Sequence, residues 1–156
     1  MAKFPTEVER SVVVRVPVTR AYEYLSDVAR SAGCIPSIAR CERVGDDTWR
    51  FTSKERSVGP LTMSVRYTAR YEGNGKDRIL FRSVGAEGDS ADVDGTFSLH
   101  ALGEDTTRIE LRQMIAPETP VPRLLQGMIR SFVEREAAGE IEQFLDGVRR
   151  ALESAA

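Results

Sequence analysis

Residues 123–153, RLLQGMIRSFVEREAAGEIEQFLDGVRRALE, carry apolar side chains at the spacing of one helical face. An α-helix brings residues three and four positions apart together, so this spacing predicts one long amphipathic helix. At 1.5 Å per residue, roughly 30 residues span about 45 Å, which is long for a domain of this size. The helix must therefore run across the whole of the sheet that it covers. Its predicted apolar stripe consists of Leu125, Met128, Ile129, Phe132, Val133, Ala137, Ile141, Phe144, Leu145, Val148 and Leu152.

The sequence before this helix alternates apolar and polar residues with the period of two that is typical of β-strands. Residues 6–16 show this alternation, and so do residues 61–71, LTMSVRYTARY. Turn sequences such as Gly59-Pro60 and Gly73-Asn74-Gly75 separate the alternating segments. The pattern predicts an antiparallel meander with one apolar and one wet face, whose long strands suit a strongly curved sheet. The predicted apolar face includes Trp49 and Phe51, Leu61 to Tyr71 at every second position, Phe97 and Leu99, and Ile109 and Leu111.

Two short helices are predicted between the first strand and the meander. Residues 18–27 read as a helix in which Thr19 is a plausible N-cap, and Asp27 can cap a second helix at residues 28–32. Gly33 is the expected stop of that second helix, because glycine tolerates the left-handed conformation.

In the long helix, Gly127 and Gly139 cost about 1 kcal/mol each relative to alanine. We expect them either to allow close packing on a strand or to leave room for a ligand.

Composition bounds the class of protein. The 156 residues suit one domain, 1–156, with a net charge of −2 and arginines interleaved with acids, so we expect no nucleic-acid partner. No apolar run approaches the ~18 residues of a membrane span. The first ten residues, MAKFPTEVER, lack the apolar region of a secretory signal, so a cytoplasmic location is expected.

Catalytic and metal-binding patterns are weak in this sequence. Cys34 and Cys41 with the distant His100 do not complete a four-ligand zinc site, and neither cysteine has a nearby histidine to activate it. His100 shares the wet face of its strand. We therefore expect no metal, no cofactor and no catalytic triad, and two cysteines that pack as small apolar residues.

Three stretches carry a resemblance to a known family: VPVTRAYEYLSDVARSAGCIPSIARCERVGDD at 16–47, SVGPLTMSVRYTARYEG at 57–73 and ADVDGTFSLHALGEDTTRIEL at 91–111. They resemble the START-like (SRPBCC) superfamily, and most closely the G-type subunits of carbon monoxide dehydrogenase and polyketide cyclase/dehydrase-like proteins. Ser37 follows Pro36 where that pattern usually has glycine. The resemblance implies an α+β helix-grip fold, with a seven-stranded curved antiparallel sheet wrapped round a long C-terminal helix and two short helices after the first strand.

The same resemblance implies a ligand cavity between sheet and helix, with Ile35 and Pro36 at its rim. Polar residues that share the inward faces would orient a bound molecule. If Trp49 and Phe51 point inward, alternation over residues 49–57 puts Ser53, Glu55 and Ser57 on the same face. Glu55 has an equally good alternative, exposure to water, because an unpaired buried carboxylate is costly. The candidate cavity residues are Ile35, Trp49, Phe51, Ser53, Glu55, Met63, Val65, Tyr67, Phe81, Ser83, Phe97, Leu99, Gln113, Met128, Phe132 and Glu136.

Three functional hypotheses follow. The first is a non-catalytic carrier of a lipid, quinone or polyketide-like molecule, accessory to a redox enzyme or a membrane-associated partner, with residues 117–129 as a candidate exposed apolar patch. The second is a cyclase or aromatase that uses Glu55 with Tyr67 as an acid–base pair. The third is a protein-interaction module whose cavity is filled by Met63, Phe81, Phe97 and Phe132.

Overall fold

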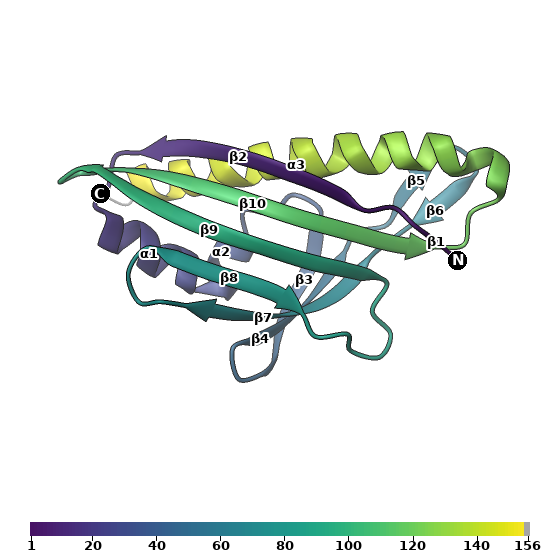
Figure 1. Ribbon diagram of the computed structural model, residues 1–156, viewed down its shortest axis with the longest axis horizontal. Coiled ribbons are helices and arrows are strands. Elements are labelled where there is room, and N and C mark those ends of the chain that lie inside the picture. The colour runs from purple at the N-terminus through teal and green to yellow at the C-terminus, as the bar shows by residue number, and fades with distance from the viewer. Residues whose placement is uncertain (155–156) are drawn as a thin grey trace.

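The long C-terminal helix is present in the computed structural model, which describes residues 1–154 (Figure 1). Helix α3 spans Gln126–Ser154 and follows one 3-10 turn, η1, at Arg123–Leu125. The first predicted turn is 3-10 because the Leu125 N–H donates to the carbonyl group of Pro122, which precedes η1 in an extended conformation. The buried residues of α3 all belong to the predicted stripe: Ile129, Val133, Ala137, Ile141, Phe144, Leu145, Val148 and Leu152.

The sheet curves round α3 and has the predicted number of positions (Figure 1). Its strands are β1 (Ala2–Lys3), β2 (Thr6–Val14), β3 (Ile38–Gly45), β4 (Thr48–Ser53), β7 (Arg66–Gly73), β8 (Arg78–Ser83), β9 (Ala91–Gly103) and β10 (Thr106–Thr119). Their order is β1-β10-β9-β8-β7-β4-β3, and β2 also pairs with β10. Because β1 and β2 succeed each other along one edge of β10, the eight strands occupy seven positions. All pairings are antiparallel, which confirms the predicted α+β helix-grip fold.

Two predicted strands are wrong in their extent. The strand at 61–71 is broken between Met63 and Arg66, and the alternation at 49–57 is broken after Ser53. The Ser53 N–H donates to the Val65 carbonyl group at 2.9 Å, and the Ser53 hydroxyl accepts the Val65 N–H at 2.8 Å. These bonds end the β4–β7 ladder, and the chain beyond them leaves the main sheet.

A separate hairpin forms from the residues that leave the sheet. Strands β5 (Arg56–Val58) and β6 (Leu61–Met63) pair with each other beside the first turns of α3 (Figure 1). The hairpin buries Val58 and Met63 in a small cluster with Phe4, Ile129 and Val133. It therefore extends the covering of α3 beyond the end of the sheet.

Helices α1 (Val18–Ser26) and α2 (Val28–Ala32) lie where the sequence predicts them. Asp27 caps α2 as predicted, because its carboxylate accepts the Arg30 N–H. Thr19 is not the N-cap of α1, since Pro17 occupies that position without a side-chain hydrogen bond. Gly33 ends α2 in the right-handed region at φ −62°, so the predicted left-handed stop is also wrong.

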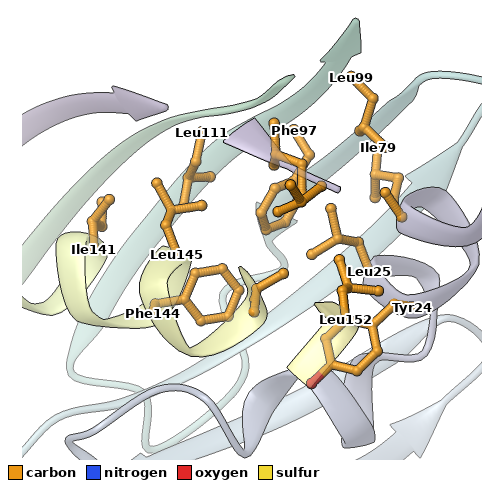
Figure 2. Packing of buried hydrophobic residues seen from close by; sticks show 14 of the residues in the cluster. Tyr24, Leu25, Ile79, Phe97, Leu99, Leu111, Ile141, Phe144, Leu145 and Leu152 are labelled. Atoms are coloured by element: carbon orange, nitrogen blue, oxygen red, sulfur yellow. The ribbon is translucent and has the colours of Figure 1, made fainter. Parts of the chain in front are cut away.

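The main core lies between the concave face of the sheet, α1 and the C-terminal half of α3 (Figure 2). Phe144 and Leu145 of α3 face Phe97 and Leu111 of the sheet, while Leu25 of α1 packs beside them. Each of these side chains is at most 6% exposed. The arrangement leaves the middle of α3 opposite the centre of the sheet, where the site described below lies.

Glycines mark where elements approach closely, at positions other than those predicted. A Cβ atom on Gly95 of β9 would overlap the Phe81 ring, and one on Gly147 of α3 would lie 3.2 Å from Cys34. A Cβ atom on Gly127 or Gly139 would meet nothing within 4 Å. Close packing on a strand is therefore the wrong explanation for these two helix glycines.

Gly95→Ala and Gly139→Ala are expected to change stability in opposite directions. The first forces the Phe81 ring, which packs between Tyr71 and Phe97, to move, and overpacking of this kind costs about 1–3 kcal/mol. The second removes a mid-helix glycine without a clash and should gain up to about 1 kcal/mol. Urea unfolding measures both, and a Gly95→Ala variant as stable as the wild type would contradict the packing described here.

Candidate functional site

Two adjoining chambers lie between the sheet and α3. The inner chamber has a volume of about 80 Å³ and the outer chamber about 100 Å³. The inner one is covered by α2 and the loop that follows it, and the outer one lies between hairpin β5–β6 and α3. Five residues line both chambers and so mark their junction: Ser37, Val65, Gln113, Ile115 and Glu140.

Aromatic rings make a continuous wall from β4 to α3. Phe51 stacks on Tyr67 with centroids 4.9 Å apart, and Tyr71 stacks on Phe81 at 5.3 Å. The ring centroids of Phe81 and Phe97 lie 5.6 Å apart, and those of Phe97 and Phe144 of α3 lie 6.0 Å apart. Figure 2 shows Phe97 and Phe144 in the core between sheet and helix. All six rings line the inner chamber. Alternation along each strand places one or two of these rings on the concave face, and antiparallel register brings them side by side.

Three neutral polar groups that line the inner chamber have no protein partner among the described residues. The hydroxyl groups of Tyr67 and Tyr71 and the side-chain amide of Gln113 make no hydrogen bond to any residue among 1–154. Burial raises the pKa of Tyr67 well above its usual value, and the nearby Tyr71 and Glu140 add to the shift. Burial likewise raises the pKa of Tyr71, with a contribution from Cys41. Both phenols therefore stay neutral and can donate or accept a hydrogen bond.

A carboxylate stands at the junction of the two chambers. Glu140 of α3 accepts the Ser37 N–H at 3.0 Å and also accepts a hydrogen bond from the Ser37 hydroxyl. These bonds tie the loop after α2 to the middle of α3. We call this pair the inner clasp.

A second link crosses the outer chamber. Arg56 of β5 donates from Nη2 to both carboxylate oxygens of Glu136, at 2.8 Å to Oε2. Its pKa is raised by the hydrogen bond to Glu136 and by the charge of that carboxylate. The pair ties hairpin β5–β6 to α3, and we call it the outer clasp. Both its side chains remain more than a third exposed, so the link is a weak one.

The structure brings most of the sequence-predicted cavity residues to the two chambers. Ile35, Phe51, Tyr67, Phe81 and Phe97 line the inner chamber. Ser53, Met63, Phe132 and Glu136 line the outer one, and Val65 and Gln113 line both.

Five predicted cavity residues lie elsewhere. Glu55 is exposed, because β4 ends at Ser53 and the alternation that would have turned Glu55 inward ends with it. Met128 lies past the end of the main sheet and is 39% exposed. The other three lie away from the chambers: Trp49 packs near the β3–β4 turn, the Ser83 hydroxyl accepts the Val93 N–H at the end of β8, and Leu99 is buried in the main core.

The sequence analysis missed Tyr71, Glu140 and Ser37 as chamber residues. Tyr71 shares the alternating face of Tyr67, so the same pattern contained it. Glu140 lies four residues before Phe144 and three after Ala137, which places it at the margin of the apolar stripe. The loop conformation that brings Ser37 to Glu140 has no signal in the sequence.

The cysteines lie in structural positions. Cys34 contacts Gly147 of α3 and lies 3.3 Å from the Tyr24 hydroxyl. Burial, with a contribution from Glu42, raises the pKa of Cys41 to about 11, so this thiol carries little thiolate at neutral pH.

His100 is exposed beside Glu110 on the outer face of the sheet. None of the helices formed by residues 1–154 could span a lipid bilayer.

Comparison with known proteins gives a family and several related structures. Residues 5–153 match the family described as polyketide cyclase / dehydrase and lipid transport, whereas no curated protein matches the chain. TTHA0849 from Thermus thermophilus is similar at a TM-score of 0.72 and 23% identity, covering 97% of this chain and 99% of that one. A START superfamily protein from Mycobacterium smegmatis gives 0.73 and 15%, covering 96% and 99%. The Zhui aromatase/cyclase from Streptomyces sp. R1128 gives 0.65 and 18%, covering 97% and 98%.

These similarities confirm the START-like resemblance seen in the sequence. The structures share the whole fold, because the matches cover nearly all of both chains. The family and the fold are those of proteins that bind hydrophobic ligands. The chain therefore belongs to the polyketide cyclase/dehydrase and lipid transport family of START-like proteins.

Proposed function

We propose that the chain binds an apolar or amphipathic small molecule in the two chambers and carries it without changing it chemically. The observation that supports this most is the set of unpaired Tyr67, Tyr71 and Gln113 groups on an aromatic wall. These polar atoms have no protein partner and are open to the chambers, so they are free to bond to whatever occupies them. A ligand with oxygen atoms on an apolar body, such as a lipid, quinone or polyketide-like ring, would bond to them while its apolar part packs on the rings.

The chambers must widen to take such a ligand. Their volumes of about 80 and 100 Å³ are below the ~300–1,000 Å³ of most ligand pockets, although each is large enough for several water molecules. The outer clasp is exposed and contributes at most about 1 kcal/mol. The inner clasp uses two hydrogen bonds to one carboxylate oxygen and is the stronger barrier. We propose that ligand entry separates both clasps.

An acid–base enzyme is the second candidate function. Glu55 is exposed and does not reach the chamber, so the pair of Glu55 with Tyr67 has no structural support. Glu140 takes its place, because its carboxylate lies at the chamber junction and is close enough to Tyr67 to affect the pKa of that phenol. Such a pair suits the proton transfers of a cyclase or dehydrase, the reactions named in the family description.

Two further predictions stay open to test. The first is an interaction module with a filled cavity, which the small chamber volumes and the lining side chains Met63, Phe81, Phe97 and Phe132 support. An accessory role for a redox enzyme related to carbon monoxide dehydrogenase rests on the sequence resemblance alone.

Binding of 2-naphthol and of naphthalene tests the polar groups of the inner chamber. The wild type is expected to bind 2-naphthol about 2–10-fold more tightly, because one hydrogen bond contributes about 0.5–1.5 kcal/mol. The double variant Tyr67→Phe/Tyr71→Phe should lose this preference while still binding naphthalene. Ligand fluorescence measures both affinities.

Tyr22→Phe is the matched control, since the Tyr22 hydroxyl accepts the Gly75 N–H outside both chambers. It should keep the preference for 2-naphthol. If neither compound binds the wild type, or if the double variant keeps the preference, the proposed use of the chamber is refuted.

Glu140→Ala is expected to speed the entry and exit of 2-naphthol, because it removes the acceptor of the inner clasp. Stopped-flow fluorescence should show both rate constants rising by about tenfold or more, from the loss of hydrogen bonds to a charged group. Glu142→Ala, on the exposed side of the same helix, should leave them unchanged. Equal rates in wild type and Glu140→Ala would show that the inner clasp does not control access.

A chemical conversion that Glu140→Gln abolishes without loss of binding would favour the enzyme.

A further inference from the structure

An exposed apolar tip lies beside the outer chamber. It consists of Leu124 on η1, Met128 on the first turn of α3, and the Gly59–Pro60 turn of hairpin β5–β6. Leu124 is 97% exposed and Met128 is 39% exposed. A Cβ atom on Gly59 would lie 3.0 Å from the Met128 Cε atom, so the turn and the helix are in contact. Figure 1 shows the hairpin and the start of α3 at one end of the molecule.

Positive charge without acidic partners surrounds this tip. Residues 120–133 contain two arginines, Arg123 and Arg130, and no Asp or Glu, so the segment carries a charge of +2. Neither arginine takes part in an ion pair within residues 1–154, and Arg130 lies 5.9 Å above the Phe4 ring. On the outer face of the sheet, by contrast, Arg82 and Arg112 each pair with a carboxylate.

We infer that the apolar tip docks on an anionic lipid surface. Leu124 and Met128 would enter the boundary between headgroups and acyl chains, while Arg123 and Arg130 contact lipid phosphates. Exposed apolar side chains beside basic ones are the combination that binds peripheral proteins to such surfaces.

Docking in this orientation has a consequence for the outer chamber. Phe132 lines the chamber and follows Leu124 by eight residues, a rise of about 12 Å along a helix. Docking through the tip would therefore hold the outer chamber about 12 Å from the membrane boundary, a short path for a ligand that moves between bilayer and protein. Docking on a lipid surface does not require the proposed function. Only the transfer of a ligand between bilayer and chamber rests on it.

Flotation with lipid vesicles tests the inference, with phosphatidylglycerol and phosphatidylcholine in equal parts compared with phosphatidylcholine alone. The full chain should bind the anionic vesicles, and less so at 0.5 M salt. Leu124→Ser should weaken binding about tenfold, and Arg123→Gln about fivefold. Leu102→Ser is the matched control, because Leu102 is 49% exposed near the end of β9, at the opposite end of the molecule (Figure 1).

Tryptophan placed at the same two positions reports insertion directly. In Leu124→Trp, brominated lipid should quench the added fluorescence, whereas in Leu102→Trp it should not; Trp49 gives both variants the same background. Absence of vesicle binding, or equal quenching at both positions, overturns the inference. A dimer in solution that Leu124→Ser dissociates, without vesicle binding, would assign the tip to a second copy of the chain instead. Leu124→Ser should leave 2-naphthol affinity in solution unchanged, so failure of docking and failure of ligand binding are separately visible.

Discussion

The fold depends on burying one face of a single long helix against a strongly curved sheet. Helix α3 has eight buried residues along its length, and they serve three partners in turn: the hairpin β5–β6, the centre of the sheet, and α1. At both ends the packed side chains are mostly aliphatic. In the middle, opposite the centre of the sheet, rings and a few polar groups leave two chambers. The cavity is thus a product of how the core is built.

The proposed function depends on a few polar side chains that line the two chambers. Tyr67, Tyr71 and Gln113 have no protein partners within residues 1–154, and burial keeps the two phenols neutral. Glu140 and Glu136, four residues apart on one face of α3, hold the two segments that cover the chambers. Helix α3 therefore lines the chambers and also carries the carboxylate of each clasp.

Much of this architecture can be predicted from the sequence, because the spacing of apolar residues indicates which face of a helix or strand is buried. The stripe on α3, the alternation of the long strands and the cap at Asp27 predict the helix-grip fold and bring most of the expected residues to the chambers. Errors arise where the alternation is interrupted. Ser53 and Val65 end a ladder through their own hydrogen bonds, so the parity that pointed Glu55 inward does not hold beyond them. The alternative from the sequence, exposure of Glu55 to water, is what the structure shows. Glu140 and Ser37 meet only through tertiary structure, which no local pattern encodes.

Native mass spectrometry of the purified protein, followed by organic extraction and identification of what is released, tests the central claim most directly. A binding protein of this kind should carry one apolar or amphipathic molecule per chain, with oxygen atoms able to reach Tyr67, Tyr71 or Gln113. Its occupancy should be lower in the double variant Tyr67→Phe/Tyr71→Phe than in the control Tyr22→Phe. A protein that shows only its own mass, even when purified at low temperature without detergent and offered a total lipid extract, would contradict the carrier function and leave the chambers as space within a packed interaction module.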